Sequence, residues 1–149
     1  MSELFWLLAI FVLLNVLDGY TTWLGLYKLP PELRAREANV FFKSVETRFW
    51  PAMIPKALIV LFGVWLFTRT ASVFGLKVID LVFAVVVLNN AYVYLSRRIT
   101  GTKHKNILNL TEELLQKWHV PEKLAKNLSF YLLLAVLITM SVYIIGTTS

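Results

Sequence analysis

The chain has 149 residues, of which 58% are hydrophobic, and its mean hydropathy is +0.66. Soluble domains average about 45–50% apolar residues, so this composition argues against a soluble domain and for a membrane protein. The absence of cysteine excludes disulfides, thiolate metal sites and a cysteine nucleophile. The net charge of +6 does not indicate nucleic-acid binding, because nearly all Lys and Arg lie in two loops beside apolar segments.

The first apolar segment, residues 4–27, is long enough to cross a bilayer, for which about 20 residues suffice. It is also too long for the core of a signal peptide, and no small-residue cleavage site follows it. Asp18 lies deep inside it, where a carboxylate costs roughly 2.5–3.5 kcal/mol on insertion scales and usually faces a partner or water. The residues that share one third of the helical wheel with Asp18 are polar or small: Asn15, Gly19, Thr22 and Gly25.

Three further apolar segments predict membrane-spanning helices over residues 52–68, 73–95 and 124–145. Pro51 and Pro55 mark the start of the first of these, because proline is tolerated in the first turn of a helix. The short link of residues 69–72 predicts an antiparallel hairpin. The predicted fold class is therefore all-α, a polytopic four-helix bundle that forms one transmembrane domain over residues 1–149.

Basic residues are concentrated in the first and third connections, whereas the link between the second and third spans has only Arg69, with Lys77 just beyond it. The extreme N-terminus and residues 146–149 have no Lys or Arg. Since cytoplasmic loops carry an excess of Lys and Arg, we expect both termini outside and both long loops in the cytoplasm.

Both long loops contain amphipathic segments. In residues 105–119 the apolar residues lie on one face of a helix and the polar residues on the other, which predicts a helix in the inner-leaflet interface. Phe41, Phe42, Val45 and Phe49 make a similar stripe and predict a second such helix over residues 40–50. Contact with the spans or with lipid is the commoner use of such stripes, and partner binding is the alternative.

Polar residues of three spans lie at similar depths. At 1.5 Å per residue, Asp18 lies about 13 Å from the cytoplasmic end of its span, Lys56 about 6 Å and the Asn89–Asn90 pair about 8–9 Å. This coincidence predicts one polar site in the cytoplasmic half of the bilayer. The alternatives are a lysine that extends to the interface, asparagines that only join helices, and a structural Asp18–Lys56 ion pair. We interpret Asp80, near the outer end of its span, as an interfacial charge outside this site.

Glu37 and Asn39 lie in the first loop, close enough to the membrane to fold back over the site. With Asp18 and Asn89 they would offer only oxygen ligands, which suit Mg²⁺ or Ca²⁺ better than zinc. No ligand spacing defines such a site, and solvation of Glu37 is an equal alternative, so we assign no metal. His104 and His119 form no HExxH pattern, and GxSxG and Walker motifs are absent.

Four short motifs resemble those of a known family: Asn15-Val-Leu-Asp18-Gly-Tyr-Thr-Thr22, Glu37-Ala-Asn39, Pro55-Lys56 and Asn89-Asn90. The family comprises uncharacterised small polytopic membrane proteins of archaea and bacteria, catalogued as a domain of unknown function. The resemblance covers about the first two thirds of the chain, and Val40 stands where the family pattern has Pro. It implies that Asp18, Glu37, Asn39, Lys56, Asn89 and Asn90 form one functional unit in a prokaryotic cell membrane, and it implies no activity.

The polar site favours binding of an ion or small polar ligand, with a carrier as one form of this function. One alternative is an accessory or scaffold subunit, in which the polar stripe fixes helix register or joins a partner. The other is a metal-dependent enzyme that acts on lipid or isoprenoid phosphates, although paired Asp-rich motifs are absent. We favour a non-enzymatic role. The expected partners are membrane lipids, with a second copy or a subunit of a membrane complex as candidates, and no nucleic acid.

Overall fold

The computed structural model describes residues 3–34, 48–102 and 107–148. This part of the chain contains five α-helices, one short 3-10 helix (η1, Pro31–Leu33) and no strand. The helices are α1 (Glu3–Tyr27), α2 (Phe49–Thr70), α3 (Val73–Thr100), α4 (Ile107–Lys117) and α5 (Glu122–Thr148). The predicted all-α fold class is therefore confirmed.

Four of these helices, α1, α2, α3 and α5, are long and apolar enough to cross a membrane. Even the shortest, α2 with 22 residues, is about 33 Å long, which exceeds the roughly 30 Å of the hydrocarbon core. The four predicted spans are thus confirmed, and the third continues past residue 95 to Thr100. Most of the second predicted amphipathic helix, residues 40–50, lies outside the described residues.

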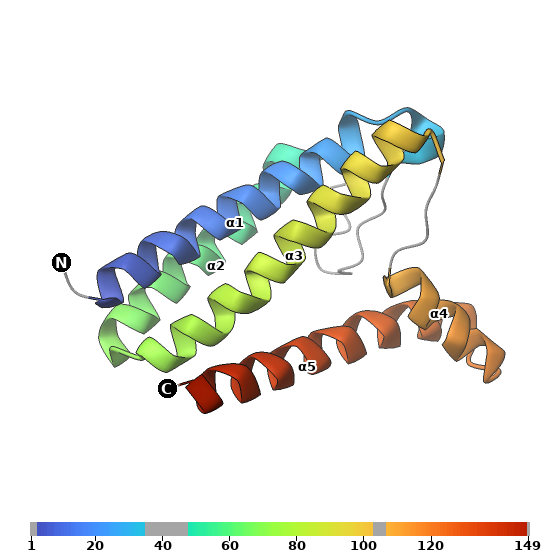
Figure 1. The fold of residues 1–149 in the computed structure, drawn as a ribbon. Coiled ribbons are helices and arrows are strands. Elements are labelled where there is room, and N and C mark those ends of the chain that lie inside the picture. The colour runs from blue at the N-terminus through green and yellow to red at the C-terminus, as the bar shows by residue number, and fades with distance from the viewer. Residues whose placement is uncertain (1–2, 35–47, 103–106, 149) are drawn as a thin grey trace.

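The spans form a bundle in which α1 and α3 lie side by side and pack most extensively, while α5 packs on α3 (Figure 1). Both chain termini and the α2–α3 turn lie at one end of the bundle, which we call the terminal end (Figure 1). The last residue of α1, the first of α2 and the last of α3 lie at the opposite end, the loop end. This arrangement agrees with the predicted topology, whereas the side of the membrane that each end faces stays a prediction.

The hairpin between α2 and α3 is made by two residues, as the short link predicts. Ala71 ends α2 in the left-handed conformation with φ 49°. Ser72 caps α3, because its hydroxyl oxygen accepts a hydrogen bond from the backbone N–H of Gly75 at 3.2 Å. A Cβ atom at Gly75 would lie 2.8 Å from that oxygen, so a glycine is needed for this close approach.

The helix α4 confirms the predicted amphipathic helix of the third connection. Leu110, Leu114 and Trp118 are exposed along it, as a helix that rests on lipid requires. The helix ends at Lys117, and His119 two residues later has a φ of 63° that reverses the chain. The N–H of Val120 bonds the carbonyl of Leu115 at 3.2 Å. This is the Schellman type of helix end. His119 therefore has a structural role at the turn into α5.

The first three spans meet at Phe11, which is buried in α1. Its ring contacts the ring of Phe67 in α2 and the ring of Phe83 in α3 edge-on, with both centroid distances 6.1 Å. A Cβ atom at Gly63 of α2 would lie only 3.0 Å from Cζ of Phe11. Gly63 thus lets α2 approach α1 closely, as small residues do between membrane helices.

We expect Gly63→Leu to destabilise the bundle by about 1–3 kcal/mol, because the larger side chain overlaps the Phe11 ring. The measurement is the midpoint of unfolding in mixed micelles with increasing sodium dodecyl sulfate. Gly146→Leu is the matched control, since no atom lies within 4 Å of a Cβ atom there. Equal effects of the two substitutions would show that the close α1–α2 contact is absent.

Candidate functional site

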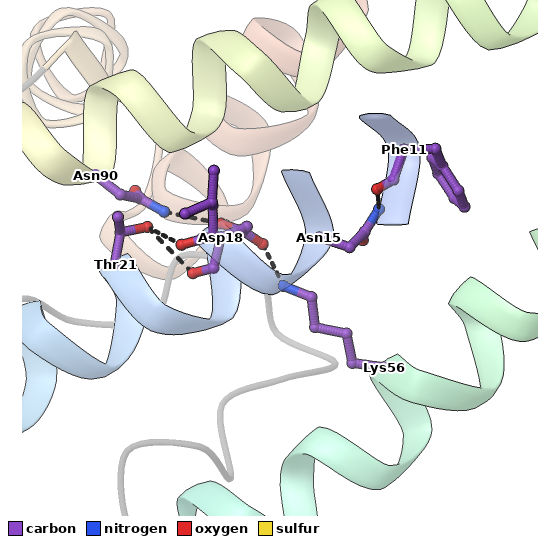
Figure 2. Close-up of polar contacts among 7 residues, drawn as sticks. Phe11, Asn15, Asp18, Thr21, Lys56 and Asn90 are labelled. Carbon is purple, nitrogen blue, oxygen red and sulfur yellow. Dashed lines mark hydrogen bonds and ion pairs between the residues drawn. The ribbon is translucent and has the colours of Figure 1, made fainter. Parts of the chain in front are cut away.

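Asp18 lies in α1, about 22 Å along the helix from Glu3 and about 13 Å from Tyr27. Its side chain is 14% exposed. One carboxylate oxygen binds the ammonium of Lys56 from α2, and the other accepts a hydrogen bond from the amide of Asn90 in α3 at 2.9 Å (Figure 2). These three residues, the Asp18 network, join three spans inside the bundle.

Lys56 turns inward to Asp18, so the alternative in which it extends to the interface is wrong. Its side chain is 17% exposed, which leaves the ammonium little access to surrounding solvent or lipid headgroups. An isolated charge is costly at this depth, and the pairing of opposite charges offsets that cost. The amide of Asn90 adds a neutral donor. The structural ion pair that the sequence left open as an alternative is therefore present.

Other polar residues of α1 bond to their own helix. The Asn15 amide donates to the carbonyl oxygen of Phe11 at 2.8 Å (Figure 2). The hydroxyl of Thr21 donates to the carbonyl oxygens of Leu17 and Asp18 at 2.9 and 3.2 Å. Such back-bonding satisfies a polar side chain in lipid without a partner helix. Asn15 thus lies beside the Asp18 network without bonding to it.

The structure brings together only part of the predicted site. Thr22 and Asn89 are half-buried, and neither makes a hydrogen bond within the part of the chain that the structure describes. Glu37 and Asn39 lie outside the described residues. Their membership in the site, and the folding of that loop segment over it, stay predictions.

A metal ion at Asp18 would have to displace an ammonium group, because Lys56 already binds one of its oxygens. Mg²⁺ and Ca²⁺ require several oxygen ligands in one place. Within residues 3–34, 48–102 and 107–148, no group of three or more His, Cys, Asp or Glu side chains is placed to hold a metal. The described residues thus provide no cluster of three or more such ligands for a metal at Asp18.

The beginning of the first loop is attached to the loop end of α3. Arg97 is buried, and its guanidinium donates a hydrogen bond to the carbonyl oxygen of Leu33 at 3.0 Å. Arg34 likewise donates to the carbonyl oxygen of Leu29 at 3.1 Å. Both bonds satisfy backbone carbonyls that no regular helix uses, and the bond from Arg97 holds η1 against α3. The two basic residues have a structural use beside the topological one predicted for them.

Asp80 is a buried acid whose burial the sequence interpretation missed. It is 6% exposed, and neither carboxylate oxygen has a hydrogen-bond partner among the described residues. On the helical wheel Asp80 lies opposite Asn89, and so on a different face of α3 from the Asp18 network. This was the one sequence signal that Asp80 has separate surroundings. The position near a helix end suggested an interfacial charge, but α1 and α5 cover that face of α3.

Comparison of the chain with protein-family models, with curated proteins and with solved structures found no match. The resemblance to an uncharacterised membrane-protein family stays a prediction. Four long apolar helices make the chain an integral membrane protein, and any narrower function has to be argued from its residues.

Proposed function

We propose that the chain binds an ion or small polar ligand at the Asp18 network, and that the ligand replaces Lys56 on the Asp18 carboxylate. The observation that carries the proposal is the ion pair itself, which joins opposite charges from two helices that are long and apolar enough to cross a membrane. Ionisable residues at such depth are rare, and they mark ligand or ion sites by default.

The packing of α2 supports this exchange. This helix is the least buried of the four spans and packs only lightly on α3. Lys56 is its polar link to α1, so a small movement of α2 would separate the two charges. A cationic ligand would then pair with Asp18, and a zwitterionic ligand would offer a partner to Lys56 as well. In a carrier, this opening and closing of α2 would be the gating step.

The test is thermal unfolding of the detergent-purified protein against a panel of metal cations, organic cations, amino acids and phosphate esters. A ligand at 100 times its dissociation constant stabilises the folded state by about 2.7 kcal/mol. We expect this stabilisation to disappear in Asp18→Asn. It should persist in Glu122→Gln, which changes a 68% exposed carboxylate at the start of α5. A stabilisation of equal size in both variants would contradict binding at Asp18.

A second candidate function, assembly with another membrane protein, is favoured by the outer face of α2. Large apolar side chains are exposed along this helix: Trp50, Ile54, Leu58, Leu61, Phe62 and Trp65. Such a face can be covered by lipid or by partner helices, and the Asp18–Lys56 pair would then serve to fix the helix that presents it. Native mass spectrometry of gently extracted membranes distinguishes assembly from ligand binding by a monomer, since a monomer without a partner would count against assembly.

A further inference from the structure

A pocket lies between α1, α3 and α5 toward the terminal end of the bundle. Its floor is α3, with Asp80 and Ala84, and its walls are α1, with Ile10 and Leu14, and α5, with Ile145. The pocket forms because α1 and α5 both pack on α3 but scarcely touch each other (Figure 1). Its volume is about 700 Å³, and it is an open groove on the side of the bundle, not an enclosed cavity.

Asp80 is the acidic residue among those that line this pocket, and it has no partner among the described residues. Both of its carboxylate oxygens are buried, so a guest reaches them only when the neighbouring aliphatic side chains move aside. It lies about 10 Å along α3 from Val73, within the span. The cation nearest along α3 is Lys77, which also lines the pocket, but its ammonium binds the carboxylate of Glu3 at 2.8 Å. A buried carboxylate without a cation is costly in a membrane, so a positively charged guest would be stabilised at Asp80.

The lining defines the kind of cation. Mg²⁺ and Ca²⁺ need six or more oxygen ligands, and Asp80 is the one residue of the pocket lining that supplies carboxylate oxygens. An ammonium group needs only one carboxylate, to which it donates charge-assisted hydrogen bonds. The other surfaces are mainly aliphatic and match an apolar body. We propose that this pocket binds an ammonium group carried on an apolar body, with Asp80 as its counter-ion.

The ammonium could belong to a free amine or to an ethanolamine lipid headgroup, and the host membrane distinguishes these sources. In nanodiscs of phosphatidylglycerol, which has no amine, we would record thermal unfolding with cyclohexylmethylamine and with the uncharged cyclohexylmethanol. The amine is expected to raise the melting temperature, and the alcohol is not. If the lipid is the source, the melting temperature in phosphatidylethanolamine nanodiscs is raised without any added amine, and the free amine then adds little. If the free amine is the source, the change of lipid has no effect.

Three variants show whether the response to the amine depends on Asp80. Asp80→Asn removes an unpaired charge, so it should fold with a melting temperature no lower than that of the parent and lose the response to the amine. Ala84→Phe should lose the response by filling the pocket while Asp80 remains. Glu122→Gln, a carboxylate change far from the pocket, should keep it. An equal response in Asp80→Asn, an equal response to the alcohol, or no response to amine or lipid would each overturn the proposal. None of these results depends on ligand binding at Asp18.

Discussion

Lys56→Met is expected to destabilise the bundle more than Asp18→Asn, although the two substitutions remove opposite ends of one ion pair. The reason is the length of the side chain that remains. A short carboxylate about 13 Å from the nearer end of α1 has no route to the interface, and only the amide of Asn90 remains as its donor. The long stem of Lys56 lets its ammonium extend to the interface when Asp18 is removed.

The magnitudes follow from the cost of charge in a bilayer. An unpaired carboxylate in a span costs roughly 2.5–3.5 kcal/mol. We therefore expect Lys56→Met to lower the free energy of unfolding by about that amount. Asp18→Asn loses mainly one interhelical contact, about 1 kcal/mol. In the double variant Asp18→Asn with Lys56→Met no charge remains unpaired, so it should be roughly 1–2 kcal/mol more stable than Lys56→Met alone.

Unfolding of the four proteins in micelles with increasing sodium dodecyl sulfate closes this double-mutant cycle. Lys77→Met is the control, because that lysine pairs with Glu3 while 38% exposed, and pairs of this kind contribute about 0–1 kcal/mol. If Lys56→Met costs no more than Lys77→Met, the ion pair does not hold α2 in the bundle.

Depth along a helix is the reason why the Asp18 network could be predicted. The rise per residue is constant, so the sequence alone places Asp18, Lys56 and Asn90 at neighbouring levels once the spans are recognised. Contact between them also needs the rotation of each helix about its axis, which depends on packing. This is why Asn90 reaches Asp18 while Asn89, the next residue, does not.

The parts that were not predictable are those where apolar residues meet one another. In a soluble helix the buried face is apolar and the exposed face polar, but in a span both faces are apolar, so the pattern does not show which residues pack. The contact between Phe11 and Gly63 and the burial of Asp80 could not be predicted without this information. The first two have no distinguishing signal among their apolar neighbours, and the burial of Asp80 depends on α5, which is remote in the sequence.

Phe11→Ala is expected to cause the second largest loss of stability, because this ring is the one that meets both α2 and α3 edge-on. In a soluble core a buried Phe→Ala substitution costs about 3–5 kcal/mol, the sum of a transfer term and a cavity term. In the bilayer the transfer term is small, since lipid is as apolar as the core, and the cavity term remains. We therefore expect a loss of roughly 2–3 kcal/mol.

Phe62→Ala is the matched control, since it makes the same chemical change at an exposed position. Phe62 is 59% exposed on α2, and its ring centroid lies 5.6 Å from that of Trp65 in the same helix. We expect it to shift the sodium dodecyl sulfate midpoint little, because lipid fills the space that the ring leaves. A loss as large as that of Phe11→Ala would mean that the exposed face of α2 is packed against protein. Such a result would support assembly through α2. A larger loss in Phe11→Ala than in Phe62→Ala would show that α2 is held in the bundle by the face that contacts Phe11.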